Sequence, residues 1–427
     1  MSGARFLYNL LLLLAAPLLP LRLLWRARRQ PAYLHHLGER LGFYAARPSS
    51  PLIWLHAVSV GETRACAPLI AALQHRFPAH AILLTHMTPT GREAGEQLFG
   101  QQVMRCYLPY DYPFAVKRFL AHFQPCLGLL VETELWPNLI AACRARQMPS
   151  SLVNARLSEK SAQRYLRLAK LARETFRGLN RVCTQTDADA QRLIRLGALD
   201  VQILGNIKFD IAPPENAQAN AAGLRALFGA RLVLLLASTR DGEEALLLEA
   251  FTRNIAPRPL LVIVPRHPQR FDEVASLIAK HGLKYQRRSD NAAIRPDTDV
   301  VLGDSMGEMF SFYGAADLAF IGGSLLPLGG QNLIEACAMG TPALIGPHTF
   351  NFEEATQQAI VRGAALRVTD ADMLFSEARR LLADGASRAQ MGAAGHLFWR
   401  QNQGAAERTV AALAPLVNDD ASATIPL

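Results

Sequence analysis

Short apolar segments of strand character alternate with helical segments along this chain, and the alternation occurs as two series. The predicted strands of the first series cover residues 52–58, 81–87, 103–108, 127–133, 151–155, 181–186 and 201–205. Those of the second series cover residues 231–238, 259–265, 299–304, 317–323 and 341–347. Strands separated by helices of about ten to fifteen residues indicate parallel, doubly wound sheets. We therefore expect an α/β chain with two Rossmann-like domains that face each other across a cleft, where the carboxyl ends of the strands would bind a ligand.

The boundary between the two series is a segment rich in Pro, Ala and Asn, residues 211–221 (IAPPENAQANA), which we interpret as a linker. The predicted domains are residues 34–211 and 222–418, preceded by an N-terminal segment, residues 1–30. A last helical stretch, at about 370–417, is expected to cover the second domain, with a return to the first domain as the alternative.

The N-terminal segment is apolar and then basic. Residues 6–21 (FLYNLLLLLAAPLLPL) carry no charge, and a helix of that length is about 24 Å long, shorter than the roughly 30 Å hydrocarbon core of a bilayer. Pro17 and Pro20 are expected to kink it. Four arginines and Trp25 follow within residues 22–29, which is the composition of a cytoplasmic membrane boundary.

We therefore expect this segment to be a retained anchor with the body of the protein in the cytoplasm. A cleaved signal peptide and a core helix are the alternatives. Whether the anchor spans the bilayer or lies in one leaflet stays open at this point.

Composition narrows the classes of ligand. The 45 Lys and Arg exceed the 36 Asp and Glu by nine, which gives a formal net charge of +9. No basic run with interleaved aromatic residues is present, so the sequence argues against nucleic acid and favours a membrane surface or an anionic substrate. The six cysteines occur singly without a CxxC pair, which indicates neither a zinc site nor a disulfide framework.

Three DxD strings are candidate metal ligands, at Asp187–Asp189, Asp297–Asp299 and Asp370–Asp372. The first and third precede helical segments and are predicted to be N-caps, and the second is predicted to be a turn. The sequence therefore predicts no metal site and no cofactor. It also lacks the Walker A, GxSxG and HExxH strings of common nucleotidases and hydrolases.

Charged side chains follow three strands of the first series. Glu62 lies in HAVSVGETRA, in the first turn of a helix predicted at residues 61–77, where the helix dipole favours an ionised carboxylate suited to act as a base. Glu132 and Glu134 follow the fourth strand, and like charges near Glu62 would be costly unless a cation or a proton is shared. Lys208 follows the last strand in GNIKFD and is able to hold phosphate or stabilise negative charge. The structural alternatives are helix capping for the carboxylates and a solvated loop for the lysine.

Loops of the second series have the character of an anion site. VPRHPQR places Arg266 and His267 directly after a buried strand. DSMGEM places Gly307, Glu308 and Met309 at a helix start, where free backbone N–H groups bind anions.

The glycine-rich string GGSLLPLGGQNLIEACAMGTP is the third such loop. Gly329 and Gly330 allow the backbone to approach a ligand, and a helix is predicted to open near Asn332. A phosphate would then sit at that helix N-terminus, with Glu335 within reach of a ribose hydroxyl.

These strings resemble the 3-deoxy-D-manno-octulosonic acid (Kdo) transferases of lipid A biosynthesis. The matching strings are ERLGFY (39–44), HAVSVGETRA (56–65), VETELWPN (131–138), NARLSEKSAQRY (154–165), GNIKFD (205–210), VPRHPQRF (264–271), GEM (307–309) and GGQNLIE (329–335). They follow the family order from about residue 34 to residue 355, together with the apolar, arginine-flanked N-terminus.

The resemblance implies two Rossmann-like domains in the arrangement of the GT-B glycosyltransferases. It also implies transfer of Kdo from CMP-Kdo to a lipid A precursor, lipid IVA, at the cytoplasmic face of the inner membrane. Glu62 matches the general base of the family, and Glu132 and Lys208 match its transition-state stabilisers. The positions that match its CMP-binding segments are Pro265, Arg266, His267, Gly307, Glu308, Met309, Asn332, Leu333, Ile334 and Glu335. His56 and Arg64 lie nearby and are weaker candidates for substrate contact.

The implied chemistry is direct and inverting. A sugar hydroxyl is a poor nucleophile, so Glu62 would take its proton as it attacks the anomeric carbon. Arg266 and the helix near Asn332 would stabilise the departing CMP phosphate without a metal, while Lys208 could instead serve the donor carboxylate or an acceptor phosphate. A phosphorylated lipid acceptor would account for both the anchor and the basic surface.

Two other functions stay open on the sequence alone. One is a UDP-sugar transferase of the same fold that acts on a membrane lipid. The other is a membrane-anchored nucleotide-binding scaffold without turnover.

Overall fold

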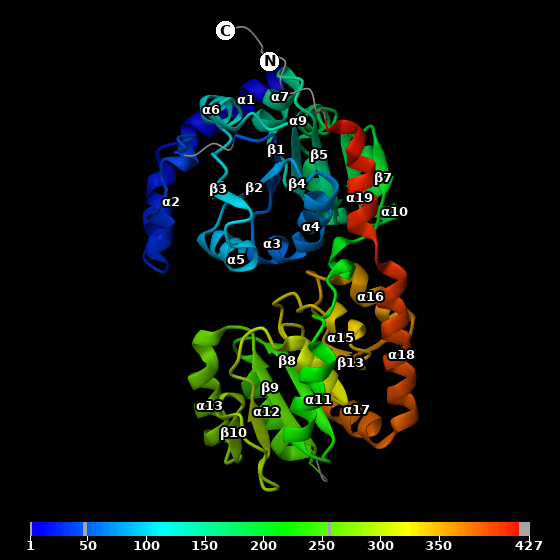
Figure 1. Ribbon diagram of the computed structural model, residues 1–427. Coiled ribbons are helices and arrows are strands. Elements are labelled where there is room, and N and C mark those ends of the chain that lie inside the picture. The colour runs from blue at the N-terminus through cyan, green and yellow to red at the C-terminus, as the bar shows by residue number, and fades with distance from the viewer. Residues whose placement is uncertain (1, 46–48, 255–257, 418–427) are drawn as a thin grey trace. The chain divides into compact units, whose positions relative to one another are not determined.

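The computed structural model describes residues 2–45, 49–254 and 258–417, which form two compact units (Figure 1). Unit 1 runs from the N-terminus to Ile211 and takes up the chain again from Gln403, and unit 2 is Ala212–Asn402. Each unit contains a seven-stranded parallel sheet. The predicted α/β class with two Rossmann-like halves is therefore confirmed.

The sheet of unit 1 has the order β3-β2-β1-β4-β5-β6-β7. Its strands are β1 (Leu52–His56), β2 (Ala81–His86), β3 (Met104–Tyr107), β4 (Leu127–Val131), β5 (Ser150–Ala155), β6 (Arg181–Thr184) and β7 (Val201–Ile203). The strand order reverses direction between β1 and β4, which makes their carboxyl ends the topological switch point where such sheets bind ligands.

Helices cover both faces of this sheet. They are α3 (Val60–Ala65), α4 (Ala67–Arg76), α5 (Pro89–Phe99), α6 (Pro113–Phe123), α7 (Pro137–Ala145), α8 (Glu159–Leu166), α9 (Ala169–Phe176), α10 (Asp187–Arg195) and α19 (Ala405–Leu413), with the 3-10 helices η2 (Glu39–Leu41), η3 (Ile207–Asp210) and η6 (Ala414–Leu416). Alternate residues of β1 enter opposite cores: Leu52 and Trp54 pack in one apolar cluster, and Ile53 and Leu55 in the other. Burial on both faces explains why these strands are continuous apolar runs.

Two helix predictions in unit 1 need correction. The single helix expected at residues 61–77 is divided at Cys66 into α3 and α4, because Pro68 cannot donate a backbone hydrogen bond and its ring clashes with the preceding turn. The last helical stretch follows the alternative that the sequence left open and does not stay with the second domain. It returns to unit 1 at Gln403, and the Asp210 carboxylate accepts the N–H of Gly404 at 2.5 Å and of Ala406 at 2.6 Å.

The sheet of unit 2 has the order β10-β11-β9-β8-β12-β13-β14, with its switch point between β8 and β12. Its strands are β8 (Val233–Thr239), β9 (Leu260–Pro265), β10 (Tyr285–Arg287), β11 (Val300–Leu302), β12 (Leu318–Ile321), β13 (Ala343–Ile345) and β14 (Ala365–Arg367). The edge strands β10 and β14 are absent from the prediction. Each is three residues long, too short for a periodic signal.

The helices of unit 2 include one that the sequence placed in a linker. They are α11 (Ala217–Phe228), α12 (Glu243–Asn254), α13 (Phe271–Lys280), α14 (Met309–Ala315), α15 (Ile334–Ala338), α16 (Glu353–Val361), α17 (Ala371–Ala383) and α18 (Gly385–Asn402), with the 3-10 helices η4 (Pro268–Arg270) and η5 (Arg288–Asp290). Residues 217–221 of the expected linker form the first turns of α11, because Ala217 and Ala221 are buried where α11 packs against α14.

The N-terminal segment forms two helices, α1 (Gly3–Ala15) and α2 (Leu18–Ala27), followed by the 3-10 helix η1 (Pro31–Leu34). The axes of α1 and α2 differ by 57°. Pro17 is the N-cap of α2 and marks the predicted kink, whereas Pro20 lies in the first turn of α2, where a missing N–H is tolerated. Among the described residues no single helix is long and apolar enough to cross a membrane, although α1 and α2 together meet that test by length and composition.

Candidate active site

The candidate catalytic residues of unit 1 follow neighbouring strands at the carboxyl edge of its sheet. Glu62 comes shortly after β1, Glu132 directly after β4, and Lys208 lies in η3 after β7. Because β1 and β4 pair side by side, Glu62 and Glu132 lie on the two sides of the switch point.

Glu62 is held by the start of α3. Ser59 is the N-cap and its Oγ accepts the Glu62 N–H, while the Ser59 hydroxyl donates to Glu62 Oε1 at 2.8 Å. The backbone N–H of Val58 donates to Glu62 Oε2, also at 2.8 Å. These three hydrogen bonds cap the start of α3 and fix the carboxylate in place.

The protonation of Glu62 differs from the expectation based on the helix dipole alone. Burial, aided by the negative charge of Glu132, raises the pKa of Glu62 to about 7, and the hydrogen bonds from Val58 and Ser59 offset only part of this. The helix dipole therefore does not determine the pKa of Glu62, because the cost of removing the charged carboxylate from water is larger. A carboxylate with a pKa near neutrality is well matched to accept and release a proton.

Glu132 is paired with two cations. Lys208 Nζ lies 2.8 Å from Glu132 Oε1, and Arg156 Nε lies 2.9 Å from Glu132 Oε2. Burial alone would raise the pKa of Glu132, but the charges and hydrogen bonds of Lys208 and Arg156 hold it below its usual value. Lys208 and Arg156 are thus the cations that compensate Glu132, whereas Glu62, with a pKa of about 7, is able to hold a proton instead.

The backbone at Glu132 has an unusual conformation. Its φ of 60° lies in the left-handed region, which is costly for a residue with a Cβ. The Glu132 N–H still donates to the carbonyl of Val153 at 2.9 Å, so the residue continues the sheet while its side chain turns toward Lys208.

Glu134 and His56 occupy supporting positions. Trp136 Nε1 donates to Glu134 Oε2 at 3.1 Å, and burial raises the pKa of Glu134. His56 is fully buried, its Nδ1 lies 2.9 Å from Thr85 Oγ1, and its ring meets Trp136 edge-on with centroids 5.7 Å apart. Burial lowers the pKa of His56 to about 3, so it is neutral. This environment favours a structural role for His56 over substrate contact, and Arg64 is exposed.

The expected CMP segments lie at the carboxyl edge of the unit 2 sheet. Pro265 ends β9, and the N–H of Arg266 donates to the carbonyl of Thr239 at the end of β8, at 2.9 Å. Burial, with the charges of Arg240, Arg266 and Arg270, lowers the pKa of His267. Four basic side chains therefore gather where β8 and β9 end, two of which, Arg240 and Arg270, the sequence analysis did not single out.

The GEM segment begins α14. Gly307 has a φ of 81°, Glu308 is the N-cap, and Met309 is the first helical residue. The Glu308 carboxylate accepts from Arg288 Nη2 at 2.9 Å and from the Ser305 hydroxyl. These contacts hold Glu308 in place and fix the turn at the start of α14.

The glycine-rich loop folds back on itself before α15. The N–H of Gly330 donates to the carbonyl of Gly323 at 2.7 Å, and a Cβ at Gly329 would lie 2.3 Å from Asn351 Nδ2, so the loop admits only glycine there. Asn332 Oδ1 accepts the N–H of Ile334 at 3.0 Å, and Asn332 Nδ2 donates to Glu335 Oε1 at 3.1 Å.

Asn332 thus lies one position before the buried Leu333, the N-cap of a helix of only five residues. The Asn332 side chain already accepts the first N–H of this helix, so one donor of the expected phosphate position is occupied.

Glu243 is a residue that sequence reasoning missed. Its side chain is fully buried and accepts three backbone N–H groups, from Arg240 at 3.0 Å, Gly323 at 2.6 Å and Leu325 at 3.0 Å. It therefore joins the loops after β8 and β12 across the switch point of unit 2. Its neighbour Glu244, also buried, accepts from Arg270 Nη1 at 2.7 Å.

The DxD strings have structural partners. Asp370 caps α17 as predicted, whereas the cap of α10 is Thr186, and Asp187 lies one position inside the helix. Asp297 pairs with Lys284 Nζ at 2.9 Å. Within the described ranges, no three His, Cys, Asp or Glu side chains are grouped so that they could hold a metal ion.

Comparisons with known proteins agree with this architecture. The family described as 3-deoxy-D-manno-octulosonic-acid transferase (kdotransferase) matches residues 35–211. A 3-deoxy-D-manno-octulosonic acid transferase of Bordetella pertussis is 47% identical over 96% of this chain and 98% of its own, and that of Haemophilus influenzae is 38% identical over the same shares. The solved structure of a glycosyltransferase from Rickettsia africae matches 87% of this chain and all of its own with a TM-score of 0.57 at 14% identity, which supports the fold alone.

The fold, with these relatives, defines a glycosyltransferase built from two Rossmann-like units. The chain belongs to the 3-deoxy-D-manno-octulosonic acid transferase family.

Proposed function

We propose that this protein transfers Kdo from CMP-Kdo to a lipid A precursor, lipid IVA, with inversion and without a metal ion, at the cytoplasmic face of the inner membrane. The names of the relatives support Kdo as the transferred sugar. The observation that carries the mechanism is the partly buried Glu62 carboxylate, with a pKa of about 7, beside the Glu132–Lys208–Arg156 cluster.

Glu62 is the base in this proposal. As the acceptor hydroxyl oxygen attacks the anomeric carbon of Kdo, its proton passes to Glu62 and the bond between that carbon and the CMP phosphate oxygen breaks. The bonding electrons leave with CMP. Direct displacement by one nucleophile inverts the configuration at the anomeric carbon.

Glu132 and Lys208 act as an electrostatic unit. Because Lys208 and Arg156 already compensate the charge of Glu132, the cluster presents fixed charges without reorganisation during the reaction. Lys208 is the group of the cluster that is able to face a developing negative charge, and Glu132 holds it in place.

Unit 2 holds the donor in this proposal. The CMP-binding positions are Pro265, Arg266, His267, Gly307, Glu308, Met309, Asn332, Leu333, Ile334 and Glu335. Arg266 and the neighbouring Arg240 supply positive charge for the phosphate and for the carboxylate of Kdo, whereas the charge of Arg270 is compensated by Glu244 and Glu273. The pairing of Asn332 with Glu335 fixes the side chain that would meet the ribose.

The test is turnover of Glu62→Gln. Purified wild type and variant are incubated with lipid IVA and CMP-Kdo generated in situ, and Kdo-lipid is measured by mass spectrometry. Loss of a positioned base lowers the rate by about 10² to 10⁴, while CMP binding stays intact. Glu93→Gln, an exposed glutamate of α5 in the same unit, is the matched control.

Addition of EDTA after the donor has formed tests metal independence, since activity is expected to persist. Equal turnover by wild type and Glu62→Gln would overturn the role of Glu62. No product from the wild type, together with product from a UDP-sugar, would overturn the donor. CMP binding without any turnover would indicate the scaffold.

A further inference from the structure

Hydrogen bonds along one side of helix α1 hold it against the rest of unit 1. The Tyr8 hydroxyl donates to Asp111 Oδ2 at 3.0 Å, and Asn138 Nδ2 donates to Asn9 Oδ1 at 2.6 Å. One turn further on, the Tyr112 hydroxyl donates to the backbone carbonyl of Leu12 at 2.8 Å. Residues three to four positions apart share one face of a helix, so these bonds lie along a single side of α1.

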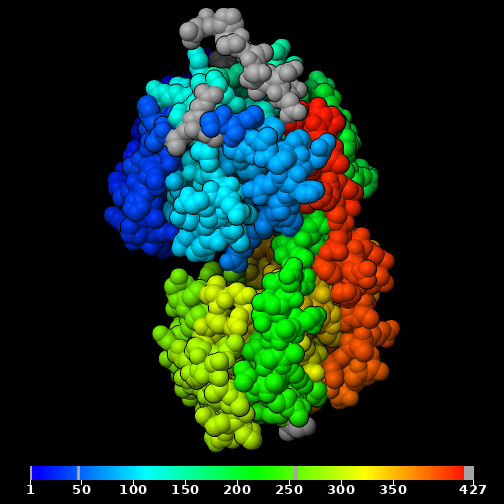
Figure 2. Space-filling view, viewed as in Figure 1, coloured from blue at the N-terminus to red at the C-terminus, as the bar shows by residue number. Residues whose placement is uncertain are grey.

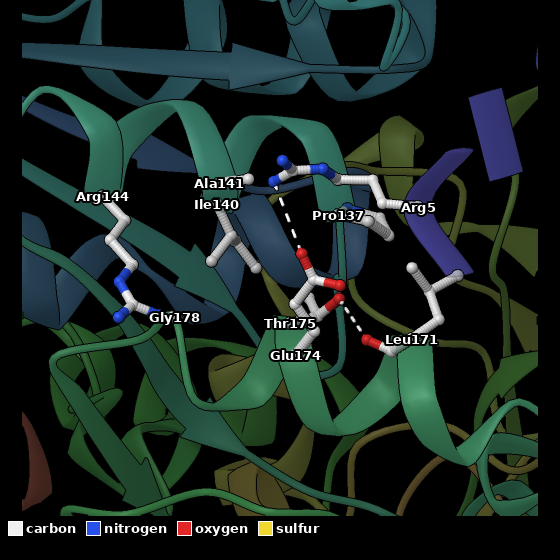
Figure 3. A pocket seen from close by; sticks show the side chains of 9 residues that line it. All are labelled: Arg5, Pro137, Ile140, Ala141, Arg144, Leu171, Glu174, Thr175 and Gly178. Carbon is white, nitrogen blue, oxygen red and sulfur yellow. Dashed lines mark hydrogen bonds and ion pairs between the residues drawn. The ribbon is translucent and has the colours of Figure 1, made fainter. Parts of the chain in front are cut away.

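The beginning of α1 is fastened on the same side. Arg5 Nη1 lies 3.6 Å from Glu174 Oε1 of α9, and the Ser2 hydroxyl donates to the same carboxylate. Figure 3 shows Arg5 reaching across a hollow between α7 and α9 to Glu174. Polar contacts therefore run from the first residues of α1 to Leu12, and all of their partners belong to the globular body.

Moving α1 away from unit 1 would leave buried polar groups without hydrogen-bond partners. Asp111 is 3% exposed and also accepts the N–H groups of Asn138 and Leu139, each at 2.9 Å. A helix that crossed a bilayer would carry Tyr8 and Asn9 into hydrocarbon, where their polar groups would lack partners, and would leave the Asp111 carboxylate without Tyr8. The structure therefore keeps α1 lengthwise against unit 1.

The other sides of α1 and α2 are apolar and open. Leu7, Leu10, Leu11 and Leu14 of α1 and Leu21 and Trp25 of α2 are between 42% and 67% exposed, and we call these six side chains the apolar face. In Figure 2 the dark-blue atoms of α2 form one margin of unit 1. A stripe of exposed leucines at helical spacing on α1, with two more exposed apolar side chains on α2, is typical of a membrane or protein contact.

The body of unit 1 adds exposed aromatic residues near α1. Phe114 is half exposed and stacks on Tyr112, the residue bonded to Leu12, with ring centroids 5.8 Å apart. The Arg118 guanidinium lies 5.4 Å from the Phe114 ring and 4.3 Å from that of the exposed Phe43. Apolar rings with an arginine over them suit the boundary between acyl chains and headgroups.

The arginines on and after α2 indicate what the apolar face binds. Arg22, Arg28 and Arg29 are exposed on and after α2, and Arg29 lies 5.9 Å from the ring of Trp25. Residues 6–21 are uncharged. An apolar stripe followed by arginines and a tryptophan matches a bilayer surface with anionic headgroups.

We propose that α1 and α2 lie in the plane of one leaflet of an anionic bilayer, with the apolar face buried among the acyl chains and neither helix spanning the membrane. The proposal deepens the proposed function, because it places the body against the membrane that would hold a lipid acceptor. It rests on the fastening of α1 to the body and on the exposure of the opposite side, and its tests do not need turnover.

Topology is tested by placing single cysteines at the two ends of the helix pair. Gly3→Cys and Arg28→Cys are suitable, because both positions are exposed, a Cβ at Gly3 meets nothing within 4 Å, and the six native cysteines are buried. Right-side-out and inverted inner-membrane vesicles containing the full chain are treated with a membrane-impermeant maleimide. Both positions are expected to react only in inverted vesicles. Reaction of Gly3→Cys from the opposite side to Arg28→Cys, or no reaction of either, would overturn the proposal.

Docking is tested with purified full-length protein and vesicles of phosphatidylethanolamine and phosphatidylglycerol at about 3:1. We expect wild type to float with these vesicles and the Leu10→Glu/Leu14→Glu variant to bind at least about tenfold less, because two charges enter the acyl region. Leu199→Glu, which changes a leucine of unit 1 that is 70% exposed outside the apolar face, is the matched control and should float like wild type. An unchanged melting temperature shows that the variants fold.

Equal flotation of wild type and Leu10→Glu/Leu14→Glu would overturn the proposal. So would a wild-type dimer in solution that this variant abolishes without loss of vesicle binding, since a second copy would then cover the apolar face. Glu62→Gln should float normally, and Leu10→Glu/Leu14→Glu should turn over a detergent-dispersed acceptor. Failure of the proposed function and failure of the docking proposal are thereby distinguishable.

Discussion

At the carboxyl edge of the unit 1 sheet the carboxylate of Glu132 is paired with cationic side chains, whereas at the corresponding edge of unit 2 the buried carboxylate of Glu243 is bound by backbone N–H groups. In unit 1, Glu132 is paired with Lys208 and Arg156, and its charge raises the pKa of Glu62. In unit 2, the fully buried Glu243 binds three backbone N–H groups. Both edges lie at a topological switch point of the same fold.

The difference shows how one fold serves two tasks. Interacting charges at low exposure shift pKa values and suit proton transfer. Backbone amides and tight glycine turns form rigid, sequence-independent cradles that suit the binding of a phosphate-containing ligand. We therefore expect variants in unit 1 to change the rate of the chemical step and variants in unit 2 to change donor affinity.

After Glu62→Gln, the largest effect should come from Lys208→Met. Removing Lys208 leaves Glu132 with Arg156 as its cation and deletes the positive charge at the reacting centre, so the turnover number is expected to fall about 10² to 10³-fold. Steady-state kinetics at saturating CMP-Kdo measures it, with CMP affinity unchanged. Lys208→Arg should recover part of the rate, because it restores the charge. A change in donor KM alone would break the assignment of chemistry to unit 1.

Arg266→Ala should have the next largest effect, and on a different parameter. Loss of a charge-assisted contact to phosphate is expected to weaken CMP binding about tenfold to a hundredfold. Calorimetric titration with CMP measures this, and the turnover number at saturating donor should change far less. Arg195→Ala, at the exposed end of α10 in unit 1, is a matched control. Unchanged CMP affinity in Arg266→Ala would remove this strand end from the donor site.

The pH dependence of the rate should follow Glu62. Because burial raises its pKa to about 7, the carboxylate becomes ionised and able to accept a proton only as the pH rises through that value. The value of kcat/KM is therefore expected to rise about tenfold between pH 6 and pH 8 and then level off. Any residual rate of Glu62→Gln should lack this profile. A rate that falls over the same range would indicate that Glu62 acts as an acid.

The sequence predicts the central part of the fold well for a physical reason. Strands such as β1 and β8 are buried on both faces, so they appear in the sequence as continuous apolar runs. Glu62, Glu132 and Lys208 stand out as charges within a few residues of a strand end. The edge strands β10 and β14 lack that signal, since three residues show no period.

Contacts between distant loops are what the sequence does not reveal. Glu243 and Gly323 are 80 positions apart, and their pairing follows from the order of β8 and β12 in the sheet rather than from any local pattern. The same holds for Arg156, which meets Glu132 from the end of the neighbouring strand β5. The raised pKa of Glu62 was missed because desolvation depends on packing, whereas the helix start is visible in the string SVGE.

The smallest expected effect is on stability, where glutamine substitutions of Glu62 and Glu243 should have opposite signs. Burial raises the pKa of both Glu62 and Glu243. For Glu62 the value of about 7 exceeds that of the unfolded chain, so its contribution to stability decreases as the pH rises from about 4.5 to 7 and stays low above that. A glutamine at this position removes the charge and keeps both partners, since its oxygen accepts from Val58 N–H and its amide donates to the Ser59 hydroxyl. Glu62→Gln should therefore raise the free energy of unfolding at pH 8 by about 1 kcal/mol and change it little near pH 5.

Glu243→Gln should have the opposite sign. All three partners of Glu243 are N–H donors, so the amide nitrogen of a glutamine would face at least one of them in a buried site, which costs about 1 kcal/mol or more. Thermal unfolding of both variants at pH 8 and pH 5 measures the two effects. A stabilised Glu243→Gln would mean that the charge, and not the donors around it, dominates in unit 2. Glu62 and Glu243 would then differ in their hydrogen-bond partners, but a buried negative charge would cost stability at both sites.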